Sequence, residues 1–216
     1  MASLQTPRAQ PARTLVFDFG AVVFRWQPEE FLPRLLPQHA SDRASTHRLA
    51  ERLFEGFGGD WADFDRGLIE PAPLAARIAA RTGLAVSDAR KVIDAIPDEL
   101  QPVPEVEALL RRLQRAGHRL FFLSNMPAPY ARHLESSHAL FEVFENGVFS
   151  SRVGLIKPEP ALFAHAADVF GCDPQTLLLI DDSRLNAEGA ARAGWGGLRF
   201  EDAAQCADAL VALGYL

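Results

Sequence analysis

The stretch TLVFDFGAVVF, residues 14–24, decides how the rest of the chain is interpreted. Residues 15–17 form an apolar run typical of a strand that is buried on both faces, and the run stops at a single carboxylate, Asp18. Gly20 follows and allows the backbone to approach a ligand closely. Parallel sheets bind ligands where their strands end, so Asp18 is a candidate site residue, although an Asp that begins an ordinary turn also fits this stretch.

The segment after this strand has the periodicity of helices. From residue 28 to residue 100 no segment alternates as a strand does, and apolar residues recur at spacings of three and four within residues 29–36, 46–57, 74–82 and 87–96. Gly83 is expected to end one helix and Ser87 to cap the next. We therefore expect an all-helical cap domain of four or five short helices over residues 27–100, placed beside the candidate site as a lid would be.

From residue 104 onward, strands and helices alternate. Expected helices cover residues 105–116, 160–170, 185–193 and 203–213, with another after Pro129, and expected strands cover residues 119–123, 147–149, 177–180 and 197–200. This alternation predicts right-handed βαβ units and a parallel sheet. The expected fold class is therefore α/β, with a Rossmann-like parallel core formed by residues 14–26 and 101–216, the cap inserted after the first strand, and a flexible tail at residues 1–13.

Composition limits the possible partners. The 216 residues are 48% hydrophobic, enough for one domain that carries an insertion. A net charge of −6 argues against nucleic acid or an anionic membrane as the main partner. No secretory signal and no membrane-spanning run is visible, and Cys172 and Cys206 stand far apart without a CxxC motif. We expect a soluble, cytoplasmic protein, and the oligomeric state is left open.

Polar side chains follow three further predicted strands. Ser124 and Asn125 come after the second strand and offer hydrogen bonds to an anion, although Ser-Asn before Pro is also a common turn. Lys157, directly before a proline, offers a point charge for phosphate, although a solvated loop lysine is the plainer interpretation. Asp181 and Asp182 repel each other unless they share a cation, although they also suit a helix cap.

These features together favour one site, because each stands at the end of a predicted strand of one sheet. Carboxylates, one ammonium group and a Ser-Asn pair suit a phosphate dianion held with a divalent metal, which is the chemistry of phosphoryl transfer.

The same residues resemble the four motifs of the haloacid dehalogenase-like hydrolase superfamily. The motifs are VFDFG at Asp18, LSN at Ser124, GLIKPEP at Lys157, and IDDS at Asp181 and Asp182. The helical insertion resembles the cap of this family, and the segment that begins at residue 61 is similar to a cap segment of its glucose-1-phosphatase-like sugar phosphatases.

The resemblance implies a catalytic role for each motif. Asp18 would be the nucleophile that forms an aspartyl-phosphate, and Lys157 would neutralise charge. Ser124 and the backbone around Asn125 would hold phosphoryl oxygens. Magnesium (Mg2+) would be held by the Asp18 carboxylate, the Gly20 carbonyl oxygen and Asp182, with Asp181 acting through water or by fixing Lys157.

One departure from the family pattern concerns proton transfer. Most family phosphatases carry a second Asp two residues after the nucleophile as general acid and base, and here that position is Gly20. General acid–base catalysis supplies about 10²–10⁴-fold in rate. We therefore expect a small phosphorylated substrate with a good leaving group, such as a sugar 1-phosphate, and faster turnover of aryl or anomeric phosphates than of glycerol phosphate.

Two other functions are compatible with the sequence. A haloacid dehalogenase shares the Asp nucleophile and needs neither metal nor second Asp, but the adjacent Asp181 and Asp182 would then place unneeded negative charge beside Asp18. A regulatory relative that binds phosphate without turnover is the non-enzymatic alternative.

Overall fold

A five-stranded parallel sheet forms the centre of the molecule. The computed structural model describes residues 14–56 and 58–216, so the expected tail and Phe57 lie outside the described residues. The strand order is β3-β2-β1-β4-β5, with β1 at Thr14–Phe17, β2 at Arg119–Ser124, β3 at Asn146–Phe149, β4 at Leu177–Asp181 and β5 at Gly196–Arg199. All neighbouring strands pair in parallel, which confirms the predicted α/β class.

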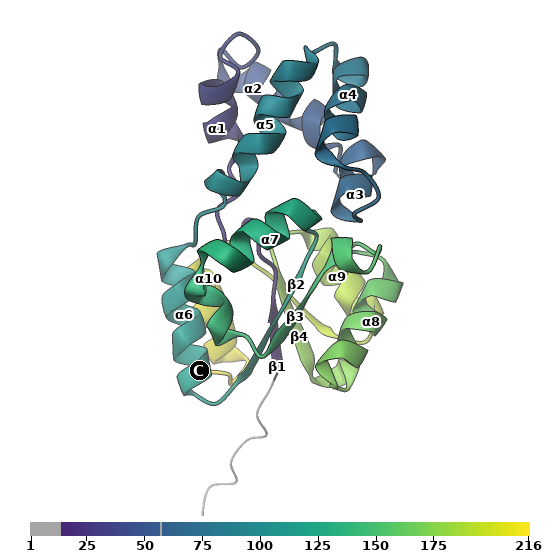
Figure 1. Cartoon of the computed structure of the whole chain (residues 1–216). Coiled ribbons are helices and arrows are strands. Elements are labelled where there is room, and N and C mark those ends of the chain that lie inside the picture. Colours follow the sequence, from purple (N-terminus) through teal and green to yellow (C-terminus); the bar gives the residue numbers. More distant parts are fainter. Residues whose placement is uncertain (1–13, 57) are drawn as a thin grey trace, which may run out of the picture.

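Helices cover both faces of this sheet. Figure 1 shows α6 (Pro104–Arg115) and α10 (Ala203–Ala212) on one side and α8 (Pro160–Phe170) and α9 (Arg184–Arg192) on the other, with α7 (Ala128–Ser137) above the strand ends. Short 3₁₀ turns lie at Ala139–Val143 (η1), Ser150–Arg152 (η2) and Pro174–Thr176 (η3).

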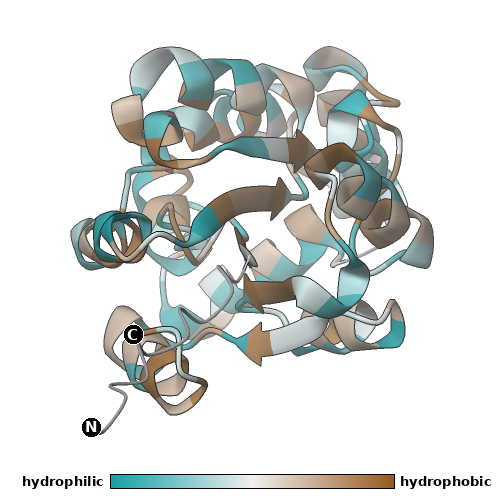
Figure 2. Ribbon diagram, turned by 90° about the horizontal axis from the view of Figure 1, so that it is seen from below, coloured by the Kyte–Doolittle hydropathy of each residue, from teal (hydrophilic) through white to brown (hydrophobic). Residues whose placement is uncertain are grey.

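Strand β1 is buried on both faces, as its sequence predicts. Leu15 and Phe17 belong to the apolar cluster that includes the α6 side chains, whereas Val16 belongs to the cluster under α8. The three central strands, β1, β2 and β4, are accordingly hydrophobic over most of their length, whereas the edge strands β3 and β5 are less so (Figure 2). A polar side chain that follows β1 is therefore held at a fixed position by a rigid, dehydrated strand.

The insertion after β1 consists of five helices in the described part of the chain. They are α1 (Pro28–Leu35), α2 (Arg43–Phe54), α3 (Gly59–Asp65), α4 (Pro71–Thr82) and α5 (Val86–Glu99), and they form a separate layer above the carboxyl ends of the strands (Figure 1). As expected, no strand interrupts them in the described residues between 28 and 100. None of the described helices is both long enough and apolar enough to cross a bilayer.

Two helix ends of the insertion test the sequence patterns. Gly83 ends α4 in the left-handed conformation with φ 74°, which confirms its predicted role. The prediction of Ser87 as the cap of α5 is wrong, because the helix already begins at Val86 and Ala85 is its N-cap. Leu84 is buried just before the first turn of α5. Burial of this apolar side chain, and not a capping side chain, therefore fixes where the helix begins.

Candidate active site

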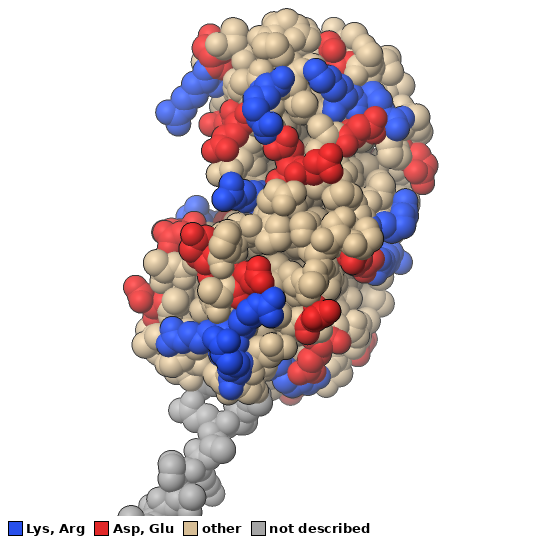
Figure 3. Space-filling model, turned by 60° about the vertical axis from the view of Figure 1, so that its left-hand side comes forward, with Lys and Arg blue, Asp and Glu red and all other residues tan. Residues whose placement is uncertain are grey.

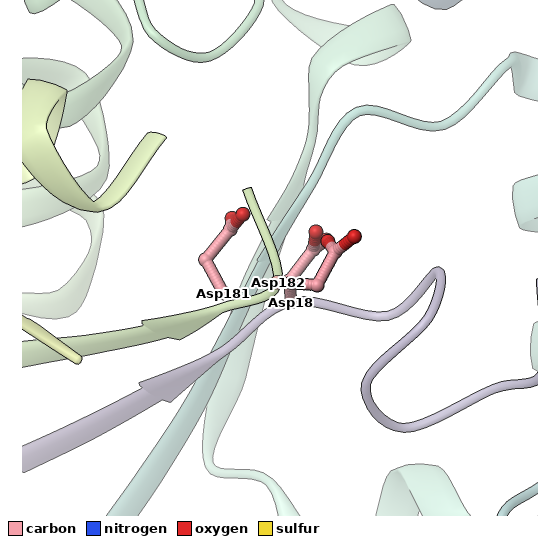
Figure 4. A group of neighbouring side chains, drawn as sticks. All are labelled: Asp18, Asp181 and Asp182. Atoms are coloured by element: carbon pink, nitrogen blue, oxygen red, sulfur yellow. The ribbon is translucent and has the colours of Figure 1, made fainter. Parts of the chain in front are cut away.

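The candidate residues meet at the carboxyl edge of the sheet. Strand β1 pairs with both β2 and β4, and Phe17 lies opposite Phe122 and Ile180. The residue that follows Phe17 is Asp18, and the residue that follows Ile180 is Asp181, so these two aspartates lie at the same level of neighbouring strands. Figure 4 shows both side chains, with that of Asp182, rising from the strand ends toward the same side of the sheet.

Lys157 connects two of these carboxylates inside the protein. Its side chain is 0% exposed, and Nζ lies 2.8 Å from Oδ1 of Asp18 and 2.6 Å from Oδ2 of Asp181. Burial lowers the pKa of this ammonium group, but the carboxylates of Asp18 and Asp181 outweigh burial and hold the pKa above its usual value. Lys157 is therefore a permanent positive charge against Asp18.

Asp181 is committed to orienting this lysine. While Oδ2 accepts the Lys157 hydrogen bond, Oδ1 accepts from the backbone N–H of Ser183 at 2.9 Å and from Nδ2 of Asn186 at 2.9 Å. Both oxygens thus have protein donors. Of the two roles that the family resemblance implies for Asp181, fixing Lys157 fits these contacts, and action on the metal through water stays a prediction.

The acidic group has the composition of a site for a hard cation. One oxygen each from Asp18, Asp181 and Asp182 lie within 4.8 Å of one another. Burial raises the pKa of Asp18 to about 8, the nearby Lys157 opposes this shift, and Asp181 and Asp182 add to it. Burial, followed by the charge of Asp181, also raises the pKa of Asp182. A divalent cation would relieve this repulsion, so the donor set fits magnesium.

Ser124 and Asn125 occupy different positions relative to this group. Ser124 is buried at the end of β2, and within the described part of the chain its Oγ has no hydrogen-bond partner. Asn125 uses its side chain on the backbone of Lys157: Oδ1 accepts from the Lys157 N–H at 2.8 Å and Nδ2 donates to the Lys157 carbonyl at 3.0 Å. The free hydroxyl suits an anion, but Ser124 is not among the residues that line the cavity above the carboxylates, so its contact with a phosphoryl oxygen stays a prediction. Asn125 lines that cavity and positions the lysine loop.

A cavity of about 270 Å³ opens above the carboxylates, between the sheet and the helical insertion. Its floor includes Asp18, Gly20 and Lys157. Its upper wall is mostly apolar and is formed by Trp26, Phe54, Trp61, Ile96 and Leu100. The insertion therefore covers the candidate active site with carbon-rich surface.

The cavity also contains residues that sequence reasoning did not single out. Asp65, the last residue of α3, lines the wall on the insertion side, and Asn186 of α9 lines the floor. Trp26 and Trp61 line the cavity and also pack against Phe54, whereas Trp195 packs against Phe163. Asp65 falls within the segment that resembles the family's cap, but that resemblance assigns it no role, because only the docking of α3 brings it to the site.

Comparisons with known proteins bear on the family and the fold. Residues 12–194 match the family described as haloacid dehalogenase-like hydrolase. A sesquiterpene phosphatase from Aspergillus oryzae is 25% identical over 191 residues, which cover 88% of this chain and 90% of that protein. The fold is similar to that of a HAD family enzyme from Bacteroides thetaiotaomicron solved with magnesium and inorganic phosphate, with a TM-score of 0.68 and 22% identity over 88% of this chain and 94% of the other.

An L-2-haloacid dehalogenase from Xanthobacter autotrophicus shares the fold as well, with a TM-score of 0.66 and 19% identity over 93% of this chain and 83% of the other. The resemblance to the superfamily is thus confirmed, and its glucose-1-phosphatase-like branch stays a prediction. The fold alone does not separate phosphatase from dehalogenase.

Proposed function

The chain belongs to the haloacid dehalogenase-like hydrolases, and on that premise we propose that it is a magnesium-dependent phosphatase that hydrolyses a small phosphorylated metabolite through Asp18. The observation that supports this most is the buried Lys157, held between Asp18 and Asp181 beside a third carboxylate at the floor of a cavity. A dehalogenase has no use for the third carboxylate, whereas a metal-assisted phosphatase does.

The reaction takes two displacements at phosphorus. A carboxylate oxygen of Asp18 attacks phosphorus, an Asp18–phosphorus bond forms, and the bond to the leaving oxygen breaks. Water then displaces the Asp18 carboxylate from phosphorus and releases inorganic phosphate. Lys157 opposes the effect of burial on the pKa of Asp18, and so favours its ionised form, and it offsets negative charge on the phosphoryl oxygens. The Ser124 hydroxyl holds one of these oxygens.

Magnesium would be held by Asp18, the Gly20 carbonyl and Asp182, with Asp181 next to them. When bound, it supplies positive charge that offsets the repulsion between an anionic nucleophile and an anionic substrate. Near Asp18 the described part of the cavity has a single basic side chain, Lys157, so the chain alone provides little of this charge.

The body of the substrate faces the apolar wall. A sugar needs hydrogen-bond partners around its hydroxyls, and Asp65 is the one ionisable side chain that the described residues of the insertion contribute to the cavity. The lining therefore favours a phosphate ester of a carbon-rich alcohol or phenol, in keeping with the sesquiterpene phosphatase among the relatives. The sugar phosphate that the family resemblance suggested remains the second candidate.

A substrate panel tests the proposal. We expect the purified protein to hydrolyse para-nitrophenyl phosphate with magnesium, to lose this activity in chelator, and to lose it by at least about 10³-fold as Asp18→Asn. The panel should include alkyl, terpenyl, anomeric sugar and glycerol phosphates at equal concentration. Turnover of a 2-haloacid that is undiminished in chelator would instead establish the dehalogenase, and phosphate binding without turnover of any ester would establish the regulatory relative.

A further inference from the structure

Gly20 leaves the site without the side chain that would move a proton. Apart from the two neighbouring residues in the chain, no atom lies within 4 Å of a Cβ atom placed at Gly20, so the space there is open. We propose that Asp65, from helix α3 of the insertion, is the general acid and base of the reaction, an inference that rests on the proposed phosphatase function. Asp65 faces the substrate's leaving oxygen from the opposite wall of the cavity.

Three contacts hold the end of α3 on the core. The carbonyl of Asp65 accepts a hydrogen bond from Oγ of Ser150 at 2.5 Å. Arg66 pairs with Glu159 at 2.5 Å, two residues after Lys157. Gly67 packs so closely on η2 that a Cβ atom there would lie 2.6 Å from the Ser151 carbonyl oxygen. The backbone of Asp65 is therefore anchored to the core, and its side chain enters the same cavity as Asp18.

The carboxyl group of Asp65 is free to exchange a proton. Within the described chain no hydrogen bond or ion pair engages its side chain, in contrast to both oxygens of Asp181. Burial raises the pKa of Asp65 to about 7, although the charges of Lys157 and Arg66 oppose this shift. At neutral pH both the protonated and the ionised forms are therefore populated, which suits a group that gives and takes a proton.

Other charged and titratable groups face Asp65 from the elements around it. Arg66 is next in the chain, Lys157 lies below, Asp18 and Asp182 line the floor of the cavity, and Tyr130 of α7 lies close enough to feel the charge of Asp65. The Tyr130 hydroxyl donates to the carbonyl of Ile93 at 2.7 Å. With that hydroxyl engaged, and its pKa raised by burial and by the charge of Asp65, Asp65 is the better proton donor on this wall.

Proton transfers by Asp65 complete both displacements. As the bond from phosphorus to the leaving oxygen breaks, the Asp65 proton passes to that oxygen and a neutral alcohol leaves. Asp65, now ionised, takes a proton from the attacking water as the new phosphorus–oxygen bond forms and the Asp18–phosphorus bond breaks. Inorganic phosphate departs with Asp65 protonated again, so protons and charges balance over the cycle.

The test compares esters whose leaving groups differ in their need for a proton. For Asp65→Asn we expect kcat/KM to fall by about 10²–10⁴-fold on an alkyl phosphate such as octyl phosphate. On para-nitrophenyl phosphate, whose leaving group is stable as an anion, we expect less than about tenfold loss of kcat/KM. Asp63→Asn, on the same helix, is the matched control and should leave both values unchanged. Equal losses on the two esters, or no loss on the alkyl ester, would overturn the proposal, whereas failure of the proposed function itself would appear as wild-type protein inactive on both.

The open space at Gly20 supplies a rescue. Gly20→Asp in the Asp65→Asn protein should restore alkyl phosphate hydrolysis by at least about tenfold, and in the wild-type background it should change the rate much less. Equal gains in both backgrounds would contradict the assignment, because the introduced carboxyl group would then add to Asp65 without replacing it.

A measurement on the wild-type protein does not depend on how the variants fold. Because the general acid must be protonated, kcat/KM for octyl phosphate should fall as the pH rises through about 7, the pKa that burial gives Asp65. The fall should be absent or much weaker for para-nitrophenyl phosphate under the same conditions. An identical alkaline fall for both esters would contradict the proposal.

Discussion

At the scale of single residues, the site depends on how one buried ammonium group is held. Lys157 follows an irregular loop, and the backbone there has no sheet to fix it. The side-chain amide of Asn125 fixes this backbone instead, because it forms two hydrogen bonds with the Lys157 backbone at 2.8 and 3.0 Å. Asn125 is thus a positioning residue for the lysine that touches Asp18.

Removal of this amide should loosen the lysine without removing its charge. For Asn125→Ala we expect two hydrogen bonds to be lost, at about 0.5–1.5 kcal/mol each, and the free energy of unfolding to fall by about 1–3 kcal/mol. We also expect kcat on para-nitrophenyl phosphate to fall by roughly 10²-fold, because small misplacements of catalytic groups cost this much. Denaturant unfolding and steady-state kinetics measure both. The exposed Asn146, at the far end of the sheet, gives the control Asn146→Ala, and unchanged kcat in Asn125→Ala would refute the positioning role.

At the scale of elements, the short helix α3 joins the insertion to the site through Gly67. Gly67 and Gly83 both have φ +74°, but only Gly67 touches the core, where a Cβ would clash with the Ser151 carbonyl. We expect Gly67→Ala to displace α3 and to lower kcat/KM by at least about tenfold. Gly83→Ala should introduce the same left-handed strain and lower the free energy of unfolding by about 1–2 kcal/mol, but it should leave kcat/KM unchanged. Equal kinetic effects of the two variants would show that the contact of α3 with η2 is irrelevant to catalysis.

The same helix shows what the sequence alone was able to predict. Asp18, Lys157 and the Asp181–Asp182 pair were predictable because apolar runs mark buried parallel strands, and topology brings strand ends to one edge. Helix α3 is too short to show a clear period, and it lies between glycines. Its last residue, Asp65, reaches the site only through tertiary contacts with η2 and Glu159, which no local pattern encodes.

At the scale of the whole molecule, charge is distributed so that the site needs a cation. Acidic and basic side chains are interspersed over the face shown in Figure 3, and the chain carries a net charge of −6. Among the described residues that line the cavity, Asp18, Asp65 and Asp182 are acidic and Lys157 alone is basic. Lys157 is already paired with two carboxylates, so the described lining of the cavity supplies no unpaired positive charge to attract a phosphate dianion.

This balance predicts that phosphate and magnesium bind together. In chelator we expect inorganic phosphate to leave the melting temperature unchanged and to give no heat in titration calorimetry, because the cavity repels it. With magnesium present, phosphate at 100 times its Kd should stabilise the protein by about 2.7 kcal/mol. Each kcal/mol raises the melting temperature of a chain of this size by about 2–4 °C.

Asp182→Asn should weaken this joint stabilisation, while Asp173→Asn, at an exposed turn that follows α8, should not. Equal phosphate binding with and without magnesium would mean that Lys157 alone suffices as the anion site, and the acidic residues would then need another explanation.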